Sequence, residues 1–151
     1  MQPTDGTETV VIDCSMTMAW YFKDEATPYT NAVRASLATE RAVVPALWPL
    51  EVANVLLMAE RRKRSNHTRA TKWLRYLSAL PIAVDAETPF RAFDHILNLA
   101  RPHKLTAYDA AYLELAVRRG VPLGTLDSDL KKAAKAVGVV LFMPPHGLTT
   151  P

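Results

Sequence analysis

The chain has 151 residues, a length that fits one domain around a single hydrophobic core. Basic residues outnumber acidic ones by 18 to 15, an excess too small to identify a nucleic-acid-binding protein by charge alone. The only cysteine, Cys14, excludes an internal disulfide. Because the sequence shows neither a secretory signal nor an apolar run long enough to cross a bilayer, we expect a cytoplasmic protein without a membrane partner.

Short apolar runs alternate with longer helical patterns along the chain, and no repeat or flexible linker divides them. We therefore expect one domain over residues 1–151, with a polar extension at 1–9 and a C-terminal tail at 143–151. In chain order the pattern predicts a strand at 10–12, a helix at 27–40, a strand at 42–44, helices at 48–64 and 66–80, a strand at 82–84, helices at 88–100 and 106–120, a strand at 121–126, a helix at 127–137 and a strand at 139–142.

Several of these helices carry recognisable start and stop residues. Thr27-Pro28 and Thr88-Pro89 each have the residue types of an N-cap and first helical position, and Gly120 is a favourable residue just after a helix end. The helix at 88–100 is expected to bury one apolar stripe, made of Phe90, Phe93, Leu97 and Ala100.

Strands that alternate with helices of this length predict an α/β fold whose parallel sheet is covered on both faces. Such sheets bind ligands beyond the carboxyl ends of their strands. The residues that follow the strands are therefore the first place to look for a functional site.

Four carboxylates fall at strand exits or helix entries. Asp13 follows the first apolar strand, Asp127 follows the fourth, and Glu51 and Asp109 lie in the first turns of two helices. A parallel sheet gathers such positions at one edge, where the acids would repel one another and raise their own pKa values unless a cation were present. Oxygen ligands suit Mg²⁺ or Mn²⁺, whereas the His and Cys clusters that zinc requires are absent from the sequence.

Three of the acids also have a structural interpretation. Asp109 follows Thr106 at the spacing of a capping box, Glu51 could answer a helix dipole, and Asp127 could be a plain N-cap. Asp13 has no structural task visible in the sequence.

Four further polar residues could support these acids. Ser15 and Thr125 each lie two residues from an acid and could orient it, although ordinary loop and strand hydroxyls would look the same. Asn54 shares a helix face with Glu51 or is simply exposed. Asp129 adds a fifth acid or occupies a favourable first helical turn.

Four short segments centre on the acids: VIDCS at 11–15, PLEVAN at 49–54, TAYDAAYL at 106–113 and TLD at 125–127. Taken in order, they resemble the PIN-domain family, and within it the VapC toxins of bacterial and archaeal toxin–antitoxin pairs. The resemblance covers about residues 10–142, and its most specific piece is the stretch 106–116 followed by the TLD segment.

This resemblance implies a Rossmann-like three-layer α/β/α sandwich around a mainly parallel, five-stranded sheet. It also implies endoribonuclease activity that needs Mg²⁺ or Mn²⁺, homodimerisation, and inhibition by a small cognate VapB-type antitoxin that pushes a segment into the active site. The acidic motif of the family falls on Asp13, Glu51, Asp109 and Asp127. Two departures, the long polar lead at 1–9 and Cys14 inside the first motif, remove no metal ligand.

On this hypothesis the protein hydrolyses RNA with water activated by the metal. Two alternatives stay open. One is a module of the same fold that binds RNA or a protein without cleaving it. The other is an enzyme that accepts a phosphoryl group on Asp13, which the Asp-Cys-Ser sequence disfavours because such enzymes carry a second nearby acid.

Basic residues could hold RNA or form a solvated face; they are Arg61, Arg62, Lys63, Arg64, Arg69, Lys72 and Arg75. The cluster Trp20-Tyr21-Phe22 could cover an antitoxin or dimer surface, or pack in the core. The histidines are expected at the surface; they are His67, His95, His103 and His146.

Overall fold

The computed structural model describes residues 2–145, and its strands form one five-stranded sheet in the order β1-β4-β3-β2-β5. Every pairing in the sheet is parallel, so the predicted α/β fold with a parallel sheet is confirmed. The strands are β1 (Gln2–Pro3), β2 (Val10–Ile12), β3 (Ala42–Pro45), β4 (Ile82–Asp85) and β5 (Leu123–Gly124).

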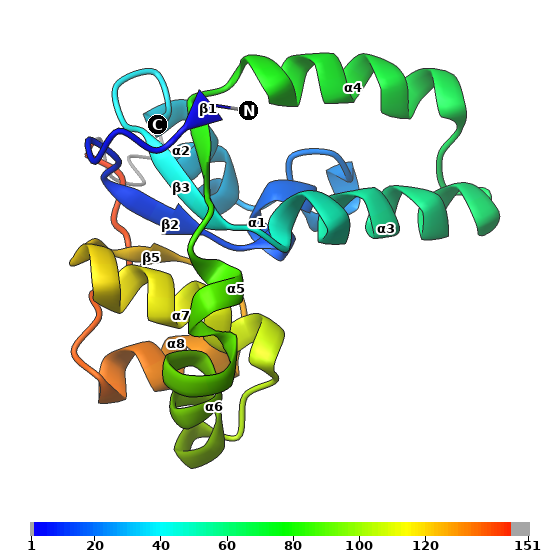
Figure 1. The fold of residues 1–151 in the computed structure, drawn as a ribbon. Helices are drawn as coiled ribbons and strands as arrows, with labels where there is room; N and C mark the ends of the chain where they lie inside the picture. Colours follow the sequence, from blue (N-terminus) through cyan, green and yellow to red (C-terminus); the bar gives the residue numbers. More distant parts are fainter. Residues whose placement is uncertain (1, 146–151) are drawn as a thin grey trace.

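Helices connect these strands and cover the sheet. In Figure 1, α6, α7 and α8 gather below the sheet, while α3 and α4 run in opposite directions to its right. The helices are α1 (Cys14–Met18), α2 (Pro28–Ser36), α3 (Trp48–Arg61), α4 (His67–Ala79), α5 (Thr88–Arg91), α6 (Leu97–His103), α7 (Ala107–Arg119) and α8 (Ser128–Ala136), with a 3₁₀ turn η1 (Lys23–Glu25) and a π-helical turn η2 (Ala92–Ile96).

The central strands are buried at every position, as the pattern of short apolar runs predicts. All residues of β2 and β3 are buried, and successive side chains of a strand point to opposite faces, so both faces of the sheet are covered. Helix α7 packs directly on β2, β3 and β5. This packing places the first turn of α7 relative to the ends of the strands.

The helix starts and stops follow the predicted caps in most places. Thr27 and Thr30 form a reciprocal capping box at the start of α2. The helix ends at Ser36 rather than at the predicted residue 40, because the backbone N–H groups of residues 37–39 bond to carbonyls three residues back and form a turn. Helix α7 ends at Gly120, whose φ of 64° lies in the left-handed region that favours glycine.

An ion-pair network joins the last turn of α7 to the end of β4. Arg118 donates hydrogen bonds to Asp85 Oδ2 at 2.8 Å and Glu114 Oε1 at 2.9 Å, and both carboxylates are buried. Arg119 reaches the buried Glu8 at 3.3 Å, from the segment before β2. The network therefore fixes the end of α7 that lies away from its acidic first turn.

The sheet edges differ from the sequence prediction. The strand predicted at 121–126 is regular only at 123–124, and the one predicted at 139–142 is reduced to a single bridge between Leu123 and Leu141. Pro122 lacks a backbone N–H and interrupts the first of these runs. The other edge is β1, which forms inside the predicted polar extension and pairs with β4. Part of the predicted tail, 146–151, including His146, lies outside the described residues.

The helix predicted at 88–100 has a different start and a different buried face. Thr88 is the first helical residue rather than the cap, and its Oγ1 instead accepts the backbone N–H of Ala46 at 2.9 Å. The predicted stripe is wrong at Phe90 and Phe93, which are 85% and 93% exposed.

The residues that replace the aromatic rings on the inner face are small or aliphatic. Ile96 and Ala100 are buried, and they pack against Ala110 and Ala111 of α7. Alanine surfaces let two helices approach closely, which a face of phenylalanines would prevent. The segment 88–100 therefore has two apolar faces, and packing against α7 determines which of them is buried.

Candidate active site

Asp13 closes strand β2 and caps the helix that follows it. Its Oδ1 accepts hydrogen bonds from the backbone N–H of Met16 at 2.9 Å and from the hydroxyl of Ser15 at 3.0 Å. Its Oδ2 accepts a hydrogen bond from the hydroxyl of Thr125. The side chain therefore does have a structural task, the N-cap of α1, which the sequence did not reveal.

Thr125 links the exits of two neighbouring strands. It is buried directly after β5, and its Oγ1 also accepts the backbone N–H of Asp127 at 3.0 Å. Asp127 in turn caps α8, since its Oδ1 accepts the backbone N–H of Leu130 at 2.8 Å. One hydroxyl group thus holds Asp13 and the loop of Asp127 together.

Glu51 and Asp109 come from the first turns of α3 and α7. Glu51 Oε1 accepts a hydrogen bond of 2.6 Å from the hydroxyl of Tyr112. The N–H of Asp109 donates to Thr106 Oγ1 at 3.1 Å, which is the N-cap half of the predicted capping box. Within residues 2–145, no hydrogen bond from the Asp109 side chain completes that box, so its carboxylate is free for another partner.

All four acids line one pocket of about 360 Å³. They reach it from the ends of β2 and β5 and from the starts of α3 and α7, as the rule for parallel sheets predicts. The remaining wall contains a fifth acid, Glu25 of η1, together with Cys14, Ser15, Met18, Val55 and Tyr112.

Burial, together with the charges of neighbouring acids, raises the pKa values of three acids in the pocket. Burial is the main cause of the raised pKa of Asp13, and the charge of Asp127 raises it further. The hydrogen bonds from Thr125, Met16 and Ser15 act in the opposite direction and lower the pKa. Burial also raises the pKa of Glu51, assisted by the charges of Asp109 and Asp13 and opposed by the Tyr112 hydrogen bond. For Asp109, burial and then the charges of neighbouring acids raise the pKa. A cation in the pocket would relieve this repulsion.

The donor set suits a hydrated divalent cation. Among the residues that the structure describes, no three His, Cys, Asp or Glu side chains converge into a ready-made metal cage. Mg²⁺ does not need one, because it keeps several water ligands and binds through one or two carboxylates. Oxygen-only donors crowded into one pocket therefore fit Mg²⁺ or Mn²⁺, with Asp13, Glu51, Asp109 and Asp127 as the residues that could hold it.

The four supporting residues predicted from the sequence fall into two pairs. Ser15 lines the pocket and Thr125 binds Asp13, so the structure brings both to the acids. Asn54 is exposed and lines an adjoining apolar pocket, of which Glu51 is also a wall. Asp129 is exposed and acts on Asp109 only through its charge.

Two residues of the site were missed by sequence reasoning. Tyr112 lies three positions after Asp109, a spacing that places both on one helix face and could have been noticed. Glu25 belongs to a single 3₁₀ turn, which has no periodic pattern, so the sequence contains no signal for it.

Two of the seven basic residues make contacts through their side chains within residues 2–145. Arg64 pairs with Asp24 at 3.0 Å and lies 4.4 Å above the ring of Phe22, while Arg69 donates to the carbonyl of Tyr21 at 2.9 Å and stacks on its ring. The other five are exposed: Arg61, Arg62, Lys63, Lys72 and Arg75.

Trp20, Tyr21 and Phe22 are buried, which confirms their packing in the core. Among the histidines, His67 and His95 are exposed and His103 is half-buried.

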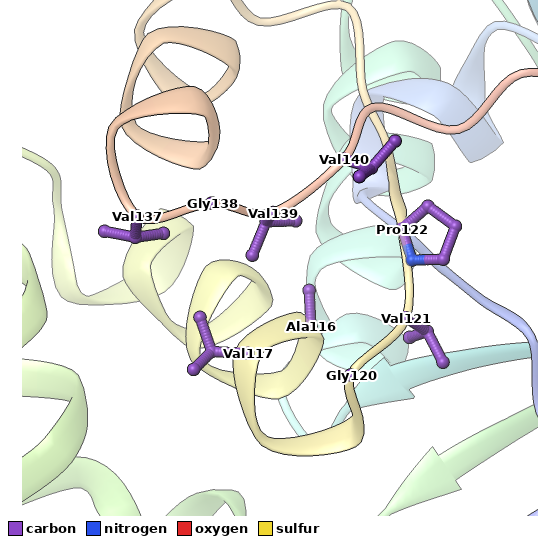
Figure 2. A pocket seen from close by; sticks show the side chains of 9 residues that line it. All are labelled: Ala116, Val117, Gly120, Val121, Pro122, Val137, Gly138, Val139 and Val140. Carbon is purple, nitrogen blue, oxygen red and sulfur yellow. The ribbon is translucent and has the colours of Figure 1, made fainter.

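A further pocket, of about 240 Å³, lies between the ends of α7 and α8 (Figure 2). Its lining is apolar and includes Val117, Val139 and Val140. None of its lining residues is titratable, so it offers no group for acid–base or metal chemistry. The acidic pocket is therefore the better candidate for an active site.

Comparison with known proteins agrees with this fold. The PIN domain family model matches residues 10–136, and the chain therefore belongs to the PIN-domain family. It is 30% identical over 128 residues to Ribonuclease VapC3 of Pyrobaculum aerophilum, an alignment that covers 85% of this chain and 96% of that protein. In the part of the chain that the structure describes, no helix is long and apolar enough to cross a membrane.

Solved structures show the same fold at lower identity. PAE2754 from Pyrobaculum aerophilum gives a TM-score of 0.63 at 23% identity, covering 89% of this chain and 83% of that one. FitAcB from Neisseria gonorrhoeae gives a TM-score of 0.59 at 17% sequence identity, covering 91% of this chain and 99% of that one. VapC20 from Mycobacterium tuberculosis, described as a sarcin–ricin loop cleaving toxin, gives a TM-score of 0.60 at 15% sequence identity. The match covers 90% of this chain and 100% of that one.

Proposed function

We propose that this chain is an Mg²⁺- or Mn²⁺-dependent endoribonuclease that acts in the cytoplasm as the toxin of a type II toxin–antitoxin pair. The observation that carries the proposal is the single pocket lined by Asp13, Glu51, Asp109 and Asp127, which come from four separate segments of the chain. Membership of the PIN-domain family and the similarity to a VapC ribonuclease support the same activity. The covered parallel sheet supports a Rossmann-like three-layer α/β/α description of the domain.

In this proposal the acids divide the work. A bound cation would acidify a water molecule and offset the negative charge that builds on the phosphate. Asp13 is held by three donors and supplies a fixed carboxylate at the bottom of the site. Asp109 has a raised pKa and a carboxylate without a hydrogen bond from residues 2–145, so it can accept the proton of the attacking water.

Water attack on phosphorus breaks the bond to the 3′ oxygen. The products then carry a 5′-phosphate and a 3′-hydroxyl, whereas attack by the ribose 2′-hydroxyl would leave a 2′,3′-cyclic phosphate. End-group analysis of RNA cleaved with Mn²⁺ present therefore tests the mechanism, and EDTA should abolish the cleavage. Cyclic phosphate ends, or cleavage that persists in EDTA, would overturn it.

Asp13→Asn separates the nuclease from a module that only binds RNA. The amide keeps an oxygen acceptor for Ser15 and Met16, so we expect the variant to fold and to lose cleavage. If wild type and variant bind RNA equally well and neither cleaves it, the non-catalytic alternative is correct.

The proposed partners are RNA, a cognate VapB-type antitoxin and a second copy of the chain. The antitoxin and the homodimer rest on the family resemblance. Light scattering on the purified chain should give the mass of a dimer. Co-expression with the cognate VapB-type antitoxin should give a stable complex that no longer cleaves RNA. A monomer, or a complex with full activity, would contradict these assignments.

A further inference from the structure

We propose that Tyr112 is a positioning residue that holds Glu51 in the conformation in which it binds the divalent cation. The inference rests on the proposed function, because it deepens the role of the same pocket. It starts from the hydrogen bond of 2.6 Å that the Tyr112 hydroxyl donates to Glu51 Oε1.

Tyr112 is a rigid donor. Its side chain is 1% exposed and belongs to the main hydrophobic core, so the ring has little freedom to move. The hydroxyl nevertheless reaches the pocket, whose lining includes both Tyr112 and Glu51. A hydroxyl at the end of a buried ring is therefore presented to the site at a fixed position.

Glu51 needs such a donor. A glutamate side chain loses much rotamer freedom when it is held in one conformation, and the nearby charges of Asp109 and Asp13 act on its carboxylate. Without the hydrogen bond, repulsion would favour conformations that turn Glu51 away from the other acids.

The hydrogen bond leaves Glu51 able to bind a cation. Tyr112 occupies Oε1, and within residues 2–145 no donor contacts Oε2. Hydrogen bonds to a metal-binding carboxylate orient it, and loss of such a partner commonly weakens metal binding about 10- to 100-fold.

Helix α7 therefore contributes twice to the site. Asp109 lines the pocket directly, and Tyr112, one helical turn later on the same face, binds the acid contributed by α3. Thr125, which follows β5, likewise donates a hydrogen bond to Asp13. One hydroxyl thus links Glu51 of α3 to helix α7, and another links Asp13 to the backbone of Asp127.

The test is the dissociation constant for Mn²⁺, measured by electron paramagnetic resonance of the free ion in the absence of RNA. Tyr112→Phe removes only the hydroxyl, and we expect the dissociation constant to rise about 10-fold. RNA cleavage by this variant should be poor at low Mn²⁺ and recover at saturating Mn²⁺. Tyr21→Phe is the matched control, because Tyr21 also has a buried ring and its hydroxyl binds Ser65, which is outside the pocket.

A double-mutant cycle separates positioning from general damage to the fold. In a Glu51→Gln background, Tyr112→Phe should have no further effect on Mn²⁺ binding. The inference is overturned if Tyr112→Phe binds Mn²⁺ like wild type, or if its effect is equally large in the Glu51→Gln background.

The same measurements distinguish this inference from the proposed function. If the wild type cleaves no RNA and Mn²⁺ binding still depends on Tyr112, the nuclease assignment fails while the positioning role stands. A wild type that binds no Mn²⁺ overturns both.

Discussion

Asp109→Asn tests whether the carboxylates of the pocket repel one another and whether a cation relieves that repulsion. Asp109 is half-buried, its carboxylate accepts no hydrogen bond within residues 2–145, and Asp127, Asp13 and Asp129 act on it as like charges. The amide keeps the size of the side chain and removes its charge without breaking a hydrogen bond. We therefore expect the variant to be more stable than wild type in the absence of metal.

The expected gain is modest because two effects oppose each other. Three like charges at a partly exposed position are each worth a few tenths of a kcal/mol, or about 1 kcal/mol together. Loss of a negative charge from the first turn of α7 costs about 0.3–1 kcal/mol, and relief from burial of that charge offsets much of this cost. A net gain of about 0.5–1 kcal/mol raises the midpoint of thermal unfolding by about 1–4 °C in a domain of this size.

Bound metal should make wild type more stable than Asp109→Asn, the reverse of the order expected in EDTA. A cation at 100 times its dissociation constant stabilises the folded wild type by about 2.7 kcal/mol, which corresponds to about 5–10 °C. Asp109→Asn lacks one ligand and should respond much less. Thermal unfolding in EDTA and then in increasing Mn²⁺ measures both effects.

The pH dependence gives a further check on the same variant. A carboxyl whose folded pKa is raised contributes stability fully below its ordinary value, here 3.8, and loses it as the pH rises through the raised value. In EDTA, the advantage of Asp109→Asn should therefore be absent at low pH and appear as the pH rises through the pKa of Asp109. The reasoning is refuted if Asp109→Asn is less stable than wild type in EDTA at pH 7. It is also refuted if Mn²⁺ raises the midpoint of thermal unfolding of the variant by as much as that of wild type.

Two other substitutions probe the contacts around the site. Thr125→Val keeps the side-chain shape but removes the donor to Asp13 and the acceptor for the Asp127 N–H, so we expect a loss of about 1–3 kcal/mol in urea unfolding. RNA cleavage by the folded variant should fall about 10- to 100-fold, and unchanged cleavage would remove Thr125 from the site. Arg118→Met leaves the buried Asp85 and Glu114 without their main partner and should cost about 3–5 kcal/mol in urea unfolding. Burial acts to raise the pKa of Asp85, but the Arg118 hydrogen bonds and charge outweigh it and lower the pKa. The loss should therefore shrink as the pH falls below the ordinary value of 3.8 and through the lowered pKa of the folded state; a loss that is the same at every pH would contradict the ionic explanation.

The sequence predicted the location of the four acids because their positions follow from the topology. Once strands and helices alternate, a parallel sheet places residues such as Asp13 and Asp127 at one edge, whatever the details of packing. Helix ends such as the one at Gly120 could also be predicted from the sequence, because the preference of glycine for a left-handed conformation is a local property of the chain.

Features that depend on tertiary packing were not accessible in the same way. The bond between Tyr112 and Glu51 exists only because α3 and α7, 61 residues apart at these positions, meet at one pocket. The inner face of the helical segment 88–100 was decided by the alanines of α7, which accept Ile96 and Ala100 but leave Phe90 in solvent. Local periodicity alone favours the larger rings.

The acids of this site also start helices, and this affects how an inactive protein for trapping an RNA complex should be made. Asp13 and Asp127 each accept a backbone N–H of the helix they precede. Alanine at either position would remove the charge together with the cap, at about 1 kcal/mol for each helix start. Asparagine caps a helix about as well as aspartate, so exchanging carboxylate for amide at these two positions should silence the chemistry while preserving the shape that the nucleic acid meets.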